Sequence, residues 1–327
     1  MNDHRASAVA VVPTEGSRAA TLYKAEERAR HYARESRAAN TRRAYRSDWA
    51  DFTAWCQEHG RTALPAEPAT VVLYLSGRAD TLKTATLERR LTAISQAHKA
   101  ADLDTPTADR AVRRVMTGIR REKGTAQEGK APAVTREVRA MVATLPATLR
   151  GQRDHGLLLL GFAGAFRRSE LVSLDVGDLA WSDDGLTVRL KRSKTDQEGA
   201  GRTVGIPYGS KPATCPVRAV RAWLTAAEVT DGPVFRGVDP HNNLRRNRLS
   251  DKTVARVVKS AAEAAGLDPT KYAGHSLRAG LATAAAQAGV AERVIMAQTG
   301  HKSLPMVRKY IREGSLFTQN AAAEVGL

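Results

Sequence analysis

The sequence predicts a mainly α-helical protein of two domains, with a small antiparallel β-sheet in the second. Three observations lead to this prediction. Apolar residues recur at helical spacing along most of the 327 residues. Apolar and polar residues alternate in one stretch, residues 186–191. A segment with two glycines, a proline and no apolar run, residues 123–133, predicts a linker in a chain long enough for two cores.

The first domain is expected over residues 28–122, after a flexible tail at 1–27 in which a helical pattern begins near Leu22. Helices are predicted at about 41–59, 68–77, 84–101 and 107–122. The first has one apolar face with steps of four, three and four, formed by Tyr45, Trp49, Phe52 and Cys56. The outward positions of these helices are mostly basic, which is typical of a solvated surface and also suits DNA.

The second domain is expected over residues 134–313, followed by a C-terminal tail at 314–327. It begins with a helix near Thr135, a buried helix at 153–163, a short turn and another helix through Leu174. Two strands, at about 186–190 and 203–207, flank a polar loop. Everything afterwards is predicted to be helical, at about 216–227, 251–265, 275–288, 291–299 and 303–312.

The charge of the chain is strongly positive. It contains 51 Lys and Arg against 34 Asp and Glu, a formal net charge of +17. Such a surplus costs self-repulsion in the free protein and is typical of proteins with a polyanionic partner, whereas a solubility surface needs only a modest charge. Nucleic acid is therefore the favoured partner.

Two cysteines, Cys56 and Cys215, lack the paired spacing of a zinc site or a disulfide framework, so we expect buried reduced thiols and no metal or cofactor. The N-terminal apolar run Ala8–Pro13 is too short for a signal-peptide core, and no segment has the apolar length of a membrane span. We therefore expect a soluble, cytoplasmic protein that, with a DNA partner, is associated with the nucleoid.

Several residues of the second domain are candidates for chemistry, although each alone has a structural explanation. His275 and Arg278 share a face if a helix begins there, and a helix N-terminus favours anions. Alone, such a pair is usually a surface pair. Arg167 follows a short turn after an apolar helix, and its ordinary role would be a salt bridge with Glu170.

Lys194 stands at the end of a strand, where most lysines only keep a sheet edge soluble. His301 follows a helix-ending glycine, and Tyr310 has apolar neighbours typical of core packing. The order Arg–Lys–His–Arg–His–Tyr nevertheless suits phosphoryl transfer through a tyrosine. Guanidiniums and an imidazole bind the phosphate, a lysine protonates the departing 5′ oxygen and a phenol attacks phosphorus.

The second domain resembles the catalytic domain of the tyrosine recombinase (phage integrase) family, where these positions occur in the same order. The resemblance rests on Phe166–Leu171, Lys194, Gly274–Arg278, Thr299–His301 and Tyr310–Arg312. The first domain resembles the SAM-like core-binding domain of Cre-type members, through Ala54–Cys56, Pro65–Pro68 and Ile119–Lys123. The resemblance covers roughly residues 30–315. It departs from the Cre type at His301, where a tryptophan stands in Cre and a histidine in most of the family.

The resemblance implies a C-shaped clamp that closes around duplex DNA. It implies that Tyr310 attacks the scissile phosphate, forming a 3′-phosphotyrosine and freeing a 5′-hydroxyl. Arg167, Arg278 and His301 would stabilise the transition state, His275 would assist proton transfer, Lys194 would be the general acid and Glu170 would support the pocket. Strand exchange would proceed through a Holliday junction without ATP.

The resemblance also implies a homotetramer on paired recombination sites. The C-terminal residues 318–327 are expected to form a helix that docks on a neighbouring subunit, with a frayed terminus as the alternative. The first domain offers candidate DNA contacts, namely Arg42, Arg43, Lys83, Arg89 and Arg90. Two other functions stay open, a type IB topoisomerase-like enzyme and a non-catalytic DNA-binding protein.

Overall fold

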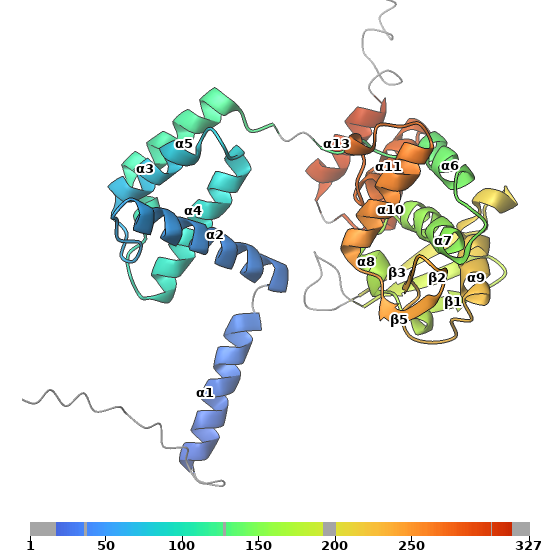
Figure 1. Ribbon diagram of the computed structural model, residues 1–327, viewed down its shortest axis with the longest axis horizontal. Coiled ribbons are helices and arrows are strands. Elements are labelled where there is room, and N and C mark those ends of the chain that lie inside the picture. Colours follow the sequence, from blue (N-terminus) through green and yellow to red (C-terminus); the bar gives the residue numbers. More distant parts are fainter. Residues whose placement is uncertain (1–17, 36–37, 127–128, 192–200, 302, 316–327) are drawn as a thin grey trace, which may run out of the picture. The chain divides into compact units, whose positions relative to one another are not determined.

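The computed structural model describes residues 18–35, 38–126, 129–191, 201–301 and 303–315. The chain divides into two compact units, Met1–Gln127 and Glu128–Leu327, and Figure 1 shows the helices and strands of each. The division falls inside the segment predicted as a linker.

The first unit is built from helices. They are α1 (Arg18–Glu35), α2 (Ala39–Glu58), α3 (Pro68–Arg78), α4 (Thr84–Ala100), the short 3-10 helix η1 (Pro106–Ala108) and α5 (Arg110–Lys123). Helix α1 begins within the segment predicted as a flexible tail, and residues 21–32 are exposed. Helices α2 and α4 pack together, as do α3 and α5. Their core includes Phe52, Tyr74, Leu87, Ile94 and Met116.

Local sequence explains where two of these helices begin. Pro68 occupies the first turn of α3, where its missing N–H costs no hydrogen bond. Asp109 lies in an extended conformation between η1 and α5, and its carboxylate accepts a hydrogen bond from the backbone N of Ala111 at 2.7 Å. The continuous helix predicted at 107–122 is therefore two helices, because Asp109 caps the second.

His98 occupies the inner face of α4 and is fully buried. Its Nε2 accepts a hydrogen bond from the backbone N of Ala66 at 2.9 Å, and its Nδ1 lies 2.9 Å from the carbonyl oxygen of Ile94. Both ring nitrogens thus have partners, so His98 joins α4 to the segment before α3 at no cost in unsatisfied polar groups.

The second unit is also mainly helical. Its helices are α6 (Thr135–Ala143), α7 (Leu149–Ala163), α8 (Arg168–Ser173), η2 (Val176–Asp178), η3 (Pro212–Thr214), α9 (Pro216–Ala226), α10 (Asp251–Ala264), η4 (Pro269–Lys271), α11 (Ser276–Gln287), α12 (Glu292–Thr299) and α13 (Leu304–Ser315). Helix α7 packs against α9 and α11, and its apolar run Leu157–Leu160 is buried, as predicted. The cysteines Cys56 and Cys215 are free and buried, also as predicted.

The end of the predicted linker belongs to the second unit. The backbone N of Ala131 donates to the carbonyl oxygen of Lys271 at 2.8 Å, and that of Ala133 donates to Ser276 at 2.9 Å. Ala133 is buried against Gly280 of α11, where a Cβ would lie 1.9 Å from the Ala133 carbonyl oxygen. Residues 131–133 are therefore anchored beside the first turns of α11.

A sheet with the order β1-β2-β3 lies in the second unit, formed by β1 (Leu179–Trp181), β2 (Gly185–Leu190) and β3 (Arg202–Pro207). It is antiparallel, and Leu190 pairs with Arg202 at the end from which the β2–β3 connection leaves. The alternating residues Leu186, Val188 and Leu190 are buried, which confirms that prediction.

A second antiparallel pair, β4 (Arg236–Val238) with β5 (Leu244–Arg248), contradicts the prediction that everything after residue 207 is helical. The sequence does not signal it because β5 has no alternation and is largely exposed. Asn242 in the connection has a positive φ of 66°, which an asparagine tolerates in a tight turn. No helix in the described part of the chain is long and apolar enough to cross a membrane.

Candidate active site

The turn between α7 and α8 places Arg167. Ala165 is left-handed (φ 49°), and the backbone N of Phe166 donates to the carbonyl oxygen of Gly161 at 3.1 Å, which closes the helix end. The Phe166 ring covers Gly164, where a Cβ would lie 2.2 Å from it. The buried ring thus fixes the direction of the chain, and Arg167 becomes the N-cap of α8.

Glu170 holds both the backbone and the side chain of Arg167. Its Oε2 accepts a hydrogen bond from the backbone N of Arg167 at 2.9 Å, and its Oε1 accepts one from Nη1 at 2.5 Å. The first contact is half of a capping box. The Glu170 side chain is 1% exposed and that of Arg167 16%, so solvent screens this ion pair little.

Arg278 lies in the first turn of α11 and is 1% exposed. Its Nη1 donates to the carbonyl oxygen of Ala165 at 2.8 Å, so the turn that places Arg167 also anchors Arg278. Its Nη2 is buried without a hydrogen-bond partner among the described residues. Burial and the nearby Arg167 lower the pKa of Arg278 to about 10, which leaves it charged at neutral pH. A buried cation with an unused N–H is suited to bind an anion.

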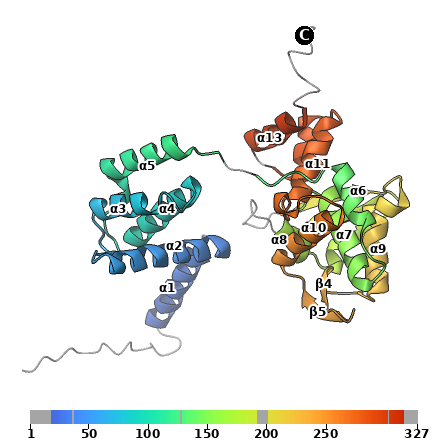
Figure 2. The ribbon, with the colours of Figure 1, turned by 45° about the horizontal axis from the view of Figure 1, so that its top comes forward.

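Tyr310 lies on α13 and packs against the apolar cluster of Ala282, Ile295 and Val307. Its hydroxyl is 2.7 Å from Nε2 of His275, the N-cap residue of α11. The contact is possible because α11 and α13 lie side by side (Figure 2). A phenol at this distance from an imidazole has the geometry to give up its proton.

Gly300 brings His301 back to this site. It ends α12 in a left-handed conformation (φ 66°), which glycine adopts without strain. His301 is buried, with 7% of the residue exposed; its Nδ1 lies 2.7 Å from Oγ1 of Thr299, and its ring centroid is 5.8 Å from that of Tyr310. Burial, and then repulsion from Arg278, lowers the pKa of His301 to about 3. The ring is therefore neutral at neutral pH in the free protein.

Arg202, the first residue of β3, belongs to the same cluster and was missed by the sequence reasoning. Its Nη2 lies 3.7 Å from Oε2 of Glu170, and its Nη1 donates to the carbonyl oxygen of Gln298 at 3.0 Å. Its guanidinium also covers Gly300, where a Cβ would lie 2.9 Å from it. Burial lowers the pKa of Arg202. No pattern in the neighbouring sequence could have indicated that Arg202 belongs to the site, because its partner Gln298 is 96 positions away along the chain.

The structure thus brings most of the predicted chemical residues into one place, namely Arg167, Glu170, His275, Arg278, His301 and Tyr310. Lys194 lies outside the described residues. One carboxylate faces three guanidiniums, so the cluster has surplus positive charge that suits a phosphodiester. In the part of the chain that the structure describes, no group of three or more His, Cys, Asp or Glu is arranged to hold a metal ion.

The candidate DNA contacts of the first unit differ in what surrounds them. Arg42 and Arg43 lie near the start of α2, and Arg43 is exposed. Lys83 immediately precedes α4 and is exposed as well. Arg43 and Lys83 therefore present basic side chains at the surface of the unit, whereas Arg42 is half-buried.

Arg89 and Arg90 of α4 are engaged inside the unit instead. Arg89 Nε lies 2.6 Å from Oδ2 of the buried Asp48, although half of its side chain remains exposed. The side chain of Arg90 is 11% exposed and donates hydrogen bonds to Asp51 and to the Tyr74 hydroxyl. Arg90 therefore joins α4 to α2 and α3, a structural role that the outward helical position did not reveal.

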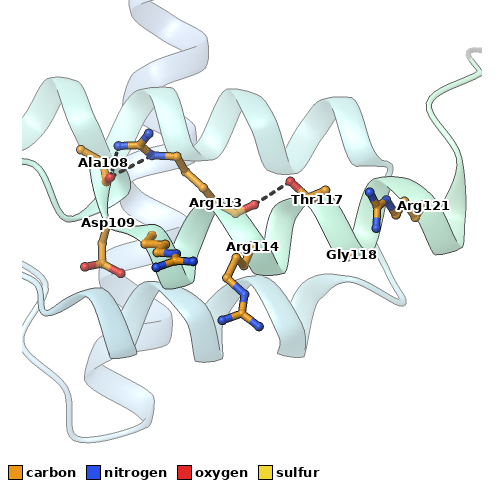
Figure 3. Close-up of a pocket in the computed structure, with 8 residues that line it drawn as sticks. Ala108, Asp109, Arg113, Arg114, Thr117, Gly118 and Arg121 are labelled. Atoms are coloured by element: carbon orange, nitrogen blue, oxygen red, sulfur yellow. Dashed lines mark hydrogen bonds between the residues drawn. The ribbon is translucent and has the colours of Figure 1, made fainter.

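Helix α5 carries a further basic surface, a shallow groove of the first unit. Figure 3 shows residues that line it, among them Arg113, Arg114 and Arg121, and the lining also includes Arg110. The Arg113 guanidinium donates to the carbonyl oxygen of Ala108, with Nε at 2.8 Å, which holds it at the start of the helix. Arginines on an exposed helix face with this density suit the DNA backbone.

Comparisons with known proteins show the family to which this chain belongs. Residues 134–315 match the phage integrase family, and residues 30–102 match the phage integrase N-terminal SAM-like domain. The chain is 47% identical to an integrase/recombinase xerD homolog of Selenomonas ruminantium, over 88% of this chain and 85% of that protein. It is 28% identical to the recombinase Cre of Escherichia phage P1, over 80% of each.

A solved structure with the same fold is XerH site-specific recombinase bound to its palindromic difH substrate in a post-cleavage complex. It matches with a TM-score of 0.57 at 16% identity, covering 79% of this chain and 72% of that one. With a family match over more than half of its length and a relative of 47% identity, this chain belongs to the phage integrase family of tyrosine recombinases.

Proposed function

We propose that this tyrosine recombinase cuts and rejoins DNA at specific sites with Tyr310 as its nucleophile. The observation that carries the proposal is the 2.7 Å contact between the Tyr310 hydroxyl and Nε2 of His275, beside three guanidiniums. The phenol oxygen attacks the scissile phosphorus while its proton passes toward His275. A 3′-phosphotyrosine forms and a 5′-hydroxyl leaves, so the bond energy is conserved and no ATP is consumed.

Arg167 and Arg278 bind the non-bridging oxygens of the phosphate and stabilise the charge that develops on them. The buried Nη2 of Arg278 supports this role because a phosphate oxygen would supply the partner that it lacks among the described residues. His301 binds the same phosphate. Glu170 holds Arg167 in place by accepting hydrogen bonds from its backbone N and from its guanidinium.

Lys194 is the general acid that protonates the departing 5′ oxygen. Its support is its place in the chain: it lies in the β2–β3 connection, between Leu190 and Arg202. Because the Arg202 guanidinium reaches Glu170, this connection ends at the phosphate-binding cluster. Lys194 is eight residues before Arg202 in the sequence, a length of chain over which its amine can reach the leaving group.

The two units together bind duplex DNA and close on it as a clamp. The basic surfaces of the first unit support this, with Arg42, Arg43 and Lys83 and the α5 groove as its phosphate contacts and Arg89 as a peripheral one. Arg90 is left to its structural role. We also propose that this DNA binding associates the protein with the nucleoid.

Recombination proceeds through a Holliday junction in a homotetramer, with residues 318–327 docking on a neighbouring subunit. Exposed apolar side chains on the nucleophile helix α13 and in or just before α12 support such docking: Leu304 and Met306, and Val290 and Val294. Deleting residues 316–327 should abolish junction assembly while leaving single-site DNA binding intact. Unchanged assembly and recombination would exclude the docking role.

The nucleophile is tested on a nicked suicide substrate that traps the covalent adduct. Tyr310→Phe should bind the DNA with unchanged affinity and form no adduct, whereas the matched control Tyr208→Phe, elsewhere in the unit, should form it at the normal rate. An adduct with Tyr310→Phe would overturn the assignment. Relaxation of plasmid that lacks a site would favour the topoisomerase-like alternative, and no adduct with the unmodified chain would favour a non-catalytic DNA-binding protein.

A further inference from the structure

Thr299, the last residue of α12, is fully buried between two polar atoms. Its Oγ1 lies 2.7 Å from the carbonyl oxygen of Ile295 and 2.7 Å from Nδ1 of His301. A third contact, to the carbonyl oxygen of Met296, is longer at 3.5 Å. Both short contacts have the length of good hydrogen bonds.

The hydrogen count fixes the direction of these bonds. A threonine hydroxyl has one hydrogen to donate and two lone pairs, and a carbonyl oxygen can only accept. Its bond to Ile295 therefore uses the Thr299 hydrogen, as in the common i−4 bond of a helical threonine. The contact with His301 must then run the other way, with Nδ1–H donating to Oγ1. The neutral His301 ring consequently carries its hydrogen on Nδ1 and a bare lone pair on Nε2.

The groups around His301 determine how this tautomer affects the binding of a phosphate. Besides the Tyr310 ring near it, four charged or titratable groups act on the His301 ring: Arg278 of α11, Arg202 of β3, and the N-cap residues of α11 and α8, which are His275 and Arg167. Burial of the His301 ring and repulsion from these cations keep the ring neutral in the free protein. An anionic phosphate offsets these cations, so it favours the protonated ring. The proton then binds at Nε2, because Nδ1 already has one.

We propose that Thr299 is a positioning residue that fixes Nδ1 of His301 as the permanently protonated nitrogen and so reserves Nε2 for the phosphate. When the phosphate enters, one proton from solvent joins Nε2, and the imidazolium donates Nε2–H to a phosphate oxygen and Nδ1–H to Thr299. This second step rests on the proposed function, whereas the tautomer of the free protein does not.

The first test is the tautomer itself, read from the ¹⁵N shifts of the His301 ring in the full chain, with His301→Gln to assign the signals. The unmodified protein should show a protonated Nδ1 and a bare Nε2. Thr299→Ser keeps the hydroxyl and should keep this pattern, whereas the near-isosteric Thr299→Val should shift the ring toward the Nε2–H form. An Nε2–H ring in the unmodified protein, or an unchanged spectrum in Thr299→Val, would overturn the proposal.

The second test is the pH profile of adduct formation on the suicide substrate. Thr299→Val removes an acceptor that favours the protonated ring, so the profile should move about one pH unit toward acid. The rate near neutral pH should fall about fivefold or more. Thr299→Ser should restore both. A Thr299→Val profile that falls in rate without moving would show a merely structural effect and refute the role. Because the ¹⁵N reading needs no DNA, it stands even if Tyr310→Phe disproves the nucleophile.

Discussion

Lowering the pH should destabilise the second unit through His301. Burial and Arg278 hold the pKa of His301 at about 3, below its ordinary 6.5, so the unfolded chain binds this proton more readily between those values. The contribution of the neutral His301 ring to the free energy of unfolding is fully present above pH 6.5 and is lost as the pH falls toward 3. From pH 7.5 to 4.5 the loss from this residue is about 2.5 kcal/mol, since each unit below 6.5 costs about 1.4 kcal/mol.

The measurement is urea unfolding of the unmodified chain and of His301→Gln at both pH values, in buffers free of phosphate and sulfate, because such anions would occupy the arginine cluster. The difference between the two proteins cancels every other titrating group. The unmodified chain should lose about 2.5 kcal/mol more than the variant. His241→Gln, which removes an exposed imidazole, controls for the loss of a histidine elsewhere. Parallel pH dependence in the unmodified chain and His301→Gln, or a His301 that titrates near 6.5 by NMR, would refute the reasoning.

Other substitutions test the rest of the site. Glu170→Gln removes the buried carboxylate that pairs with Arg167. Calorimetry should show a loss of about 3–5 kcal/mol in the free energy of unfolding, as for other broken buried ion pairs. A loss under about 1 kcal/mol would mean that this ion pair does not stabilise the fold. Arg202→Met removes the hydrogen bond from β3 to Gln298 of α12. Formation of the covalent adduct should slow about tenfold, with the affinity for DNA nearly unchanged. Equal rates of adduct formation in the variant and the unmodified chain would exclude a positioning role for Arg202. Gly280→Ala places a methyl group 1.9 Å from the Ala133 carbonyl oxygen. Urea unfolding should therefore show a loss of about 1–3 kcal/mol in the free energy of unfolding. An unchanged free energy of unfolding would mean that residues 131–133 do not pack against Gly280.

The helices were predictable because their signals are local. An apolar residue every three or four positions buries one face of a helix, as at Phe52 and Cys56 of α2, whereas the continuous apolar run Leu157–Leu160 indicates a helix, α7, that lies inside the core. The β4–β5 pair was not predictable, because its strands are held by backbone pairing and carry no apolar alternation. The helix break at Asp109 was missed for a related reason, since a capping side chain within an apolar periodicity looks like an ordinary polar position.

The sequence by itself determined which residues are available for chemistry, because their order and neighbours along the chain match a reaction that needs them all. Only the tertiary structure decided how they meet. The Ala165 turn joins Arg167 to Arg278, α11 beside α13 brings His275 to Tyr310, and Arg202 enters the cluster from β3. The physical reason is that these contacts link segments far apart in sequence, and their energies depend on burial and on neighbouring charge. The role of Arg90 was hidden for the same reason. Its helical position predicts an exposed basic side chain, but its ion-pair partner Asp51 lies on another helix of the first unit.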